Sequence, residues 1–260
     1  MAYVSNGGVR IWWEEEGAGE PLLMIMGLSF PLAMWRDLRS VMARHFRTIL
    51  FDNRGVGKSD VPLRPWSMAA MARDAVCVLD AAGVASAHVF GVSMGGMIAQ
   101  ELALSAPGRV RKLVLGCTQC GGPKAVRPGA EVRRVFLRPF VSKEKRMAAF
   151  TPFLYDQGTP RERIEEDRAV VRANSPKLRG SALQLLAILR WQAYERLPRI
   201  ASPTLVIHGD GDRLVPPENG RMIAERIPGA RFVLLPNAGH IFPTDQPERS
   251  LAEILGFLAA

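Results

Sequence analysis

A serine held between glycines is the first place where this sequence could do chemistry. Ser93 lies in Gly91-Val92-Ser93-Met94-Gly95-Gly96, between an apolar run and a helical pattern. Glycines two residues to either side remove the Cβ atoms that would clash in a sharp strand-to-helix turn. Such a turn exposes the serine Oγ and places the Met94 amide where it can stabilise an oxyanion. The spacing predicts a nucleophile, although the pattern alone is more often an ordinary turn.

A serine hydroxyl needs a histidine base and a carboxylate that orients it. Of the four histidines, His45, His88 and His208 lie at the end of a helical segment or within strands, and we interpret them as structural. His240 instead ends the polar loop 236–240, directly after an apolar strand. Loops at strand ends carry the reactive groups of α/β folds, so we predict that His240 is the base.

The carboxylate is expected from the end of another strand, where Asp210 and Asp212 compete in the loop 209–216. The early position of Asp210 indicates a turn held by its side chain, so we predict Asp212 as the acid. The chain order is then serine, aspartate, histidine, which differs from the orders of the chymotrypsin and subtilisin types.

A second oxyanion donor is expected after an early strand. The run 22–26 ends at Gly27, and this places the Leu28 N–H as the predicted donor. The glycines of the segment 52–60 do not have phosphate-loop spacing, and we interpret this segment as a buried turn held by Asp52 and Arg54.

Short apolar runs alternate with helical patterns along the chain, which favours an α/β fold with a mostly parallel, twisted sheet flanked by helices. The predicted strands are 9–16, 21–26, 48–51, 87–92, 112–116, 204–208 and 232–235, and the predicted helices are 32–43, 67–82, 95–105, 217–226 and 247–258. Residues 121–199 contain only helical pieces separated by Pro and Gly. We therefore expect a core of residues 1–120 and 200–260 with an inserted helical cap at 121–199.

Composition narrows the functional classes. The net charge of +9 lies within residues 121–200, which hold 17 Lys or Arg and 8 Asp or Glu, and we interpret it as solvated faces of amphipathic helices. No nucleic-acid motif accompanies this charge, so we expect no nucleic-acid partner. Three cysteines do not suggest a disulfide framework or a metal site. Without a long apolar stretch or a signal-peptide pattern, we expect a soluble, cytoplasmic protein. A membrane surface or an anionic substrate is the alternative interpretation of the basic segment.

In combination these motifs resemble those of the α/β-hydrolase superfamily, over nearly the whole chain. They are the turn at Met26-Gly27-Leu28, the segment 52–59, the elbow at Ser93, the acid loop 212–216 and the histidine loop 237–240. The chain looks most like small capped serine esterases and enol-lactonases. This resemblance implies a triad of Ser93, Asp212 and His240, an oxyanion hole from the Leu28 and Met94 amides, and no metal or organic cofactor.

One departure from the family pattern is Met26, at a position where many relatives have the histidine of a His-Gly turn. The hydrogen bonds of that side chain are lost here. A serine nucleophile also separates the chain from the dehalogenases of the superfamily, which would need an aspartate at position 93.

The resemblance implies hydrolysis of a small-molecule ester or lactone through an acyl-enzyme. Carbon–carbon bond hydrolysis and cofactor-free perhydrolysis by the same triad are alternatives, and a small-molecule receptor on the same fold is an alternative from another class. Residues expected to line a substrate pocket between the sheet and the cap are Phe30, Trp35, Phe136, Phe140, Trp191 and Phe242.

Overall fold

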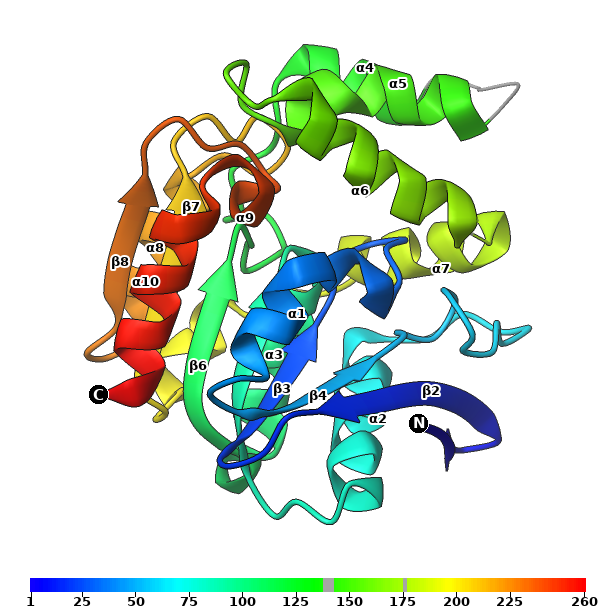
Figure 1. Ribbon diagram of the computed structural model, residues 1–260, viewed down its shortest axis with the longest axis vertical. Helices are drawn as coiled ribbons and strands as arrows, with labels where there is room; N and C mark the ends of the chain where they lie inside the picture. Colours follow the sequence, from blue (N-terminus) through cyan, green and yellow to red (C-terminus); the bar gives the residue numbers. More distant parts are fainter. Residues whose placement is uncertain (138–142, 175–176) are drawn as a thin grey trace.

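A single eight-stranded sheet forms the centre of the computed structural model, which describes residues 1–137, 143–174 and 177–260. Its strands are β1 (Ala2–Asn6), β2 (Val9–Glu16), β3 (Pro21–Ile25), β4 (Arg47–Phe51), β5 (Ala87–Val92), β6 (Val110–Gly116), β7 (Thr204–Gly209) and β8 (Arg231–Leu235). They lie in the order β1-β2-β4-β3-β5-β6-β7-β8 (Figure 1). The pairs β1–β2 and β2–β4 are antiparallel, and all the other pairs are parallel. The predicted α/β class with a mostly parallel sheet is confirmed.

The predicted strands agree with the observed ones to within two residues at each end. Strand β1 was not predicted, because it is short and its residues alternate between half-buried and exposed positions without a strong apolar run. It continues the sheet through its antiparallel register with β2.

Helices cover both faces of the sheet, and Figure 1 shows α1 and α10 in front of it, with α2 and α3 behind. The front helices α1 (Arg36–Met42) and α10 (Pro247–Ala259) pack into one apolar cluster, together with strand residues such as Leu22 and Phe90. The opposite cluster includes residues of α2 (Met68–Ala81), α3 (Met94–Ser105) and α8 (Glu218–Arg226). Two apolar layers therefore enclose the sheet, as expected of strands that are buried on both faces.

The predicted helix 32–43 is divided into two pieces. A 3₁₀ turn spans Leu32–Trp35, and α1 follows from Arg36, whose φ of 44° interrupts the regular helix. A residue with positive φ cannot continue a right-handed helix. The apolar spacing continues across Arg36, and the sequence pattern therefore did not predict this break.

Between β6 and β7 the described residues form four α-helices, which are α4 (Ala130–Leu137), α5 (Lys143–Leu154), α6 (Arg161–Ala173) and α7 (Leu178–Leu189), followed by a 3₁₀ helix at Tyr194–Arg199. Figure 1 shows this α4–α7 segment above the carboxyl ends of the parallel strands. No strand occurs in its described part. Helix α6 is fastened to the core by the buried Asp167, which accepts hydrogen bonds from Arg36 at 2.7 Å and from Thr244 at 2.8 Å.

In the portions of the chain that the structure describes, we find no helix with both the length and the apolar character needed to cross a bilayer.

Candidate active site

The turn after β5 places Ser93 in a strained conformation. Its φ of 55° and ψ of −121° lie outside the regions that a non-glycine residue usually adopts. A Cβ at Gly91 would overlap the Gly95 carbonyl, and one at Gly95 would overlap the carbonyl of Ile25. The two glycines are therefore needed for the tight passage from β5 into α3. Hydrogen bonds from the Ser93 N–H to Gly116 O and from Thr118 Oγ1 to Ser93 O, at 2.8 and 2.7 Å, hold the turn in place.

The loops after β7 and β8 bring Asp212 and His240 together. His240 Nδ1 lies 2.8 Å from Asp212 Oδ2, and both side chains are buried. The other carboxylate oxygen of Asp212 accepts the backbone N–H groups of Leu214 and Val215, at 2.9 and 2.8 Å. Since an ionised carboxylate can only accept, the proton of this pair lies on His240 Nδ1, and Nε2 is left free to act as a base.

A second histidine faces the same carboxylate oxygen. His208 Nε2 lies 3.2 Å from Asp212 Oδ2 and 2.8 Å from the Val215 carbonyl, and both of these neighbours are acceptors. His208 is fully buried and its Nδ1 has no hydrogen-bond partner, whereas both neighbours of Nε2 are acceptors, so Nε2 carries a proton. Burial alone would raise the pKa of Asp212, but His240 and His208 outweigh it and hold that pKa well below its usual value.

The histidine loop is supported by a buried carboxylate at the end of the short helix α9 (Phe242–Asp245). Asp245 accepts the Gly239 N–H and the Thr159 hydroxyl, both at 2.6 Å. Burial raises the pKa of Asp245 in spite of these hydrogen bonds. The Ile241 N–H also donates to the Leu154 carbonyl at 2.9 Å, so the α4–α7 segment holds the backbone after His240 directly and the backbone before it through Asp245.

The turn after β3 lies directly beside the serine. A Cβ built on Gly27 would be 3.1 Å from Ser93 Cβ and 3.6 Å from Ser93 Oγ. The next residue, Leu28, lines the same cavity as Ser93. The Met94 amide begins α3, where an N–H group has no acceptor within its own helix. Both predicted oxyanion donors therefore lie on the elements that flank the serine.

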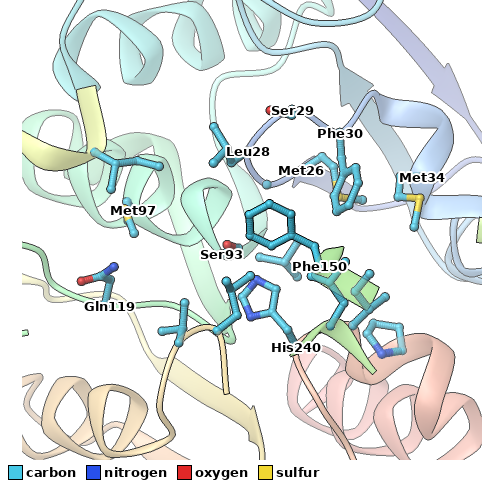
Figure 2. Close-up of a pocket in the computed structure, with 18 of the residues that line it drawn as sticks. Met26, Leu28, Ser29, Phe30, Met34, Ser93, Met97, Gln119, Phe150 and His240 are labelled. Carbon is cyan, nitrogen blue, oxygen red and sulfur yellow. The ribbon is translucent and has the colours of Figure 1, made fainter. Parts of the chain in front are cut away.

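A large cavity opens between this edge of the sheet and the α4–α7 segment. Its volume is about 1820 Å³, and both Ser93 and His240 line it. Figure 2 shows their side chains facing the cavity, surrounded by the apolar side chains of Met26, Leu28, Phe30, Met34, Met97 and Phe150. The combination of a hydroxyl, an imidazole and apolar walls suits attack on the carbonyl group of a largely apolar substrate.

The structure places the predicted pocket residues differently. Phe30, Trp35, Phe136 and Trp191 line the cavity. Phe242 does not line it, because this residue is fully buried in the front apolar cluster, where its ring packs so closely on Gly116 that a Cβ there would come within 2.8 Å. Phe140 lies outside the described residues.

Several residues of the site were missed from the sequence. Phe150 and Met34 line the cavity from helical segments whose patterns do not distinguish a wall from a core. His208 was interpreted as structural, although its spacing of four residues from Asp212, across a turn with two glycines, is a signal that could have paired them. The expected buried turn at 52–60 is present, with Asp52 and Arg54 almost fully buried.

Cys117, Asp212 and His240 bring donor atoms within 4.8 Å of one another, a spacing that a metal ion could bridge. Burial raises the pKa of the Cys117 thiol well above its usual value, and Asp212 raises it further. A thiol that stays protonated is a poor ligand, and the Asp212–His240 hydrogen bond already uses the other two donors. The chemistry of these residues fits the hydrogen bond between Asp212 and His240 better than a metal ion.

Comparison with known proteins agrees with this geometry. The sequence model of the alpha/beta hydrolase fold matches residues 20–247. The "Putative carbamate hydrolase RutD" of Azorhizobium caulinodans is 35% identical over 260 residues, which cover 99% of this chain and 98% of the relative. A poly(3-hydroxyalkanoate) depolymerase of Ectopseudomonas oleovorans is 31% identical over 92% of this chain and 84% of its own. A solved structure of a thermophilic esterase from Thermogutta terrifontis superposes with a TM-score of 0.85 at 29% identity, covering 99% of this chain and 97% of that one.

Proposed function

Because this chain belongs to the α/β-hydrolase family, we propose that it is a serine hydrolase that cleaves carboxylic esters or lactones through an acyl-enzyme. One observation carries the proposal: a serine in a strained elbow faces the same cavity as a histidine whose Nδ1 is held by a buried aspartate. Relatives named as esterase and depolymerase support hydrolysis of an acyl bond.

In the first step, Ser93 Oγ attacks the carbonyl carbon while its proton passes to His240 Nε2. The carbonyl π electrons move onto the oxygen, which the Leu28 and Met94 amides stabilise as an oxyanion. The tetrahedral intermediate then collapses, the bond to the leaving alkoxide breaks, and His240 returns the proton to that alkoxide. Asp212 stabilises the imidazolium that exists between these two proton transfers.

In the second step, water attacks the acyl-enzyme and gives its proton to His240. The bond between Ser93 Oγ and the acyl carbon then breaks, and the proton returns to the serine oxygen. The products are a carboxylic acid and the regenerated hydroxyl. In a lactone, the alkoxide and the acyl group belong to one molecule, and the product is a single hydroxy acid.

The cavity favours a bulky, apolar substrate. Ligand pockets commonly occupy about 300–1,000 Å³, and this cavity of about 1820 Å³ is larger. Apolar side chains surround the serine in Figure 2, and arginines that also line the cavity, such as Arg127 and Arg190, are exposed. We therefore infer an ester or lactone with a medium to long apolar acyl group.

The domain division belongs to the same proposal. Residues 121–199 would act as a cap over a core of residues 1–120 and 200–260, because α4–α7 supply one wall of the cavity and the loops at the strand ends supply the reactive groups.

The test is hydrolysis of 4-nitrophenyl esters by the wild-type protein and by Ser93→Ala. Loss of the nucleophile should lower kcat by at least about 10³-fold. Ser105→Ala is a matched control, because this exposed serine lies at the other end of the same helix and should leave the rate unchanged. Mass spectrometry after treatment with an alkyl fluorophosphonate should find the label on Ser93. An unchanged rate in Ser93→Ala would remove the proposal.

A further inference from the structure

Helix α7 contacts the segment 52–60 through backbone atoms. A Cβ on Gly180 would overlap the carbonyl of Gly55, and one on Gly55 would be 3.0 Å from the Cα of Gly180. Gly55 also has a φ of 93°, a conformation that favours glycine. The backbone of the helix is therefore in van der Waals contact with the backbone of the segment 52–60, and the helix has little freedom to shift towards it.

Four residues along this helix, a buried glutamine joins two core loops. Gln184 is fully buried, its Oε1 accepts the Ser29 N–H at 2.9 Å, and its Nε2 donates to the Arg54 carbonyl at 2.9 Å. One turn earlier, the Ser181 hydroxyl lies 2.7 Å from the hydroxyl of Ser29. Arg54 is itself fixed by a buried ion pair with Asp74, so the glutamine is attached to a rigid part of the core.

These contacts hold the turn after β3, which carries the Leu28 N–H and is called the oxyanion turn below. The peptide unit that carries the Leu28 N–H lies between the Met26–Gly27 unit and the Leu28–Ser29 unit. Asn53 Nδ2 holds the Met26 carbonyl at 2.8 Å, and Gln184 holds the Ser29 N–H. The Leu28 N–H is thus fixed from both sides.

The backbone at this turn needs such support. Ser29 has a φ of 65°, in the left-handed region that costs a non-glycine residue about 1 kcal/mol or more. The histidine that many superfamily members carry in this turn is Met26 here, whose side chain cannot donate a hydrogen bond. Two groups of α7 contact Ser29 directly, so the helix supplies restraint that the turn lacks.

We propose that Gln184 is a positioning residue that holds the Leu28 amide in line with the developing oxyanion, so that α7 completes the oxyanion hole. This inference rests on the proposed serine-hydrolase function. It assigns a catalytic contribution to a helix of the cap, through a side chain that does not touch the substrate.

The test compares Gln184→Leu, Gln184→Glu and the wild-type protein. The leucine removes both hydrogen bonds, whereas the glutamate keeps an acceptor for the Ser29 N–H. We expect kcat of Gln184→Leu to fall by roughly 10- to 100-fold, less than the 10²–10³-fold typical of a deleted oxyanion donor, with KM nearly unchanged. Gln184→Glu should recover part of the loss. Thr48→Val is a control for a lost buried hydrogen bond, because Thr48 Oγ1 donates to Glu16 O near the amino end of β4.

Binding of two ketones distinguishes a positioning role of Gln184 from a merely structural one. Ser93 Oγ can add to the carbonyl carbon of an alkyl trifluoromethyl ketone, its proton passes to His240, and the carbonyl oxygen becomes an oxyanion in the oxyanion hole. The matching methyl ketone binds without stable addition. Affinity for the trifluoromethyl ketone should fall in Gln184→Leu by about the same factor as kcat/KM, while affinity for the methyl ketone stays constant.

Equal losses for both ketones, or kcat equal to that of the wild-type protein, would overturn the inference. If Gln184→Leu does not fold, the same comparison is made with Ser181→Ala, which removes the hydroxyl contact to Ser29 and should show the same pattern of losses. Failure of the proposed function looks different, because then Ser93→Ala would retain activity and the fluorophosphonate would not label Ser93, whatever the behaviour of Gln184.

Discussion

Replacing Asp212 by asparagine changes one carboxylate oxygen into an NH₂ group. The hydrogen-bond partners of Asp212 determine which of the two oxygen positions the NH₂ group takes. Asp212 Oδ1 accepts two backbone N–H groups, so the remaining oxygen of the asparagine has to stay at that position. The NH₂ group then takes the place of Oδ2, where it faces His240 Nδ1 and His208 Nε2. Donation from this NH₂ to His240 Nδ1 moves the ring proton to Nε2. A ring with its proton on Nε2 cannot accept the proton of Ser93.

The expected size of the loss follows from this tautomer change. Geometry is preserved and the base is blocked, a situation for which the serine-protease precedent is about a 10⁴-fold loss in kcat. That factor corresponds to roughly 5.5 kcal/mol of transition-state stabilisation. The donor-to-donor contact with His208 adds instability that should appear in unfolding, separately from kcat.

The assay is steady-state hydrolysis of a 4-nitrophenyl ester at pH 7–8 by Asp212→Asn, with Asp210→Asn as the matched control. Asp210 lies in the same loop and accepts the Ala238 N–H at 3.3 Å, a hydrogen bond that the oxygen of asparagine can keep. We expect Asp210→Asn to stay within about threefold of the wild-type rate. The reasoning is refuted if Asp212→Asn keeps more than about a tenth of wild-type activity, or if Asp210→Asn loses as much as Asp212→Asn.

Four further outcomes are expected. Gly95→Ala should destabilise the fold by about 3 kcal/mol or more in urea unfolding, because the new methyl overlaps the Ile25 carbonyl; wild-type stability would contradict the need for glycine at the elbow. His208→Leu should lose about 1–3 kcal/mol of stability and part of kcat, since the Val215 carbonyl loses its donor, and His208→Gln should recover some of both. For 4-nitrophenyl esters, kcat/KM should rise with acyl length by up to about fourfold per methylene until the cavity is filled, and a maximum at acetate would exclude an apolar acyl site. The lowered pKa of Asp212 contributes stability that is fully present above its unfolded pKa of about 3.9 and is lost as pH falls through the folded value; the stability deficit of Asp212→Asn should therefore be largest near pH 6–7 and shrink below about pH 4 in pH-dependent urea unfolding.

The sheet could be predicted from the sequence because its parallel strands are buried on both faces and appear as continuous apolar runs. Strand β7 is buried at every position, and its predicted and observed bounds differ by one residue. Strand β1 has no such run, and its pairing depends on a neighbouring strand rather than on its own pattern. Local patterns therefore revealed the central strands and missed this peripheral one.

The pairing of Asp212 with His240 agrees with the predicted placement, because both residues follow parallel strands whose carboxyl ends meet at one edge. The roles of these residues and of Ser93 remain predictions. Gln184 could not be found in the same way, because its partners Ser29 and Arg54 are 155 and 130 residues distant in the sequence. Nothing near position 184 indicates which loop the helix will meet.

Phe242 illustrates the opposite error. It was expected to line the substrate pocket, but the chain turns into α9 at this residue and the ring lies in the core. An aromatic residue beside a reactive one lines a pocket only if the local backbone points both side chains the same way.

The backbone contact between Gly55 and Gly180 also limits how freely this protein can exchange parts with its relatives. Chimeras that replace α7 along with α4–α6 would need a glycine at the position of Gly180, because even a methyl group there cannot fit against Gly55. Exchange of α4–α6 alone would leave this contact intact and would still alter much of the cavity wall. The boundary for modular recombination therefore lies between α6 and α7, inside the helical segment rather than at its ends.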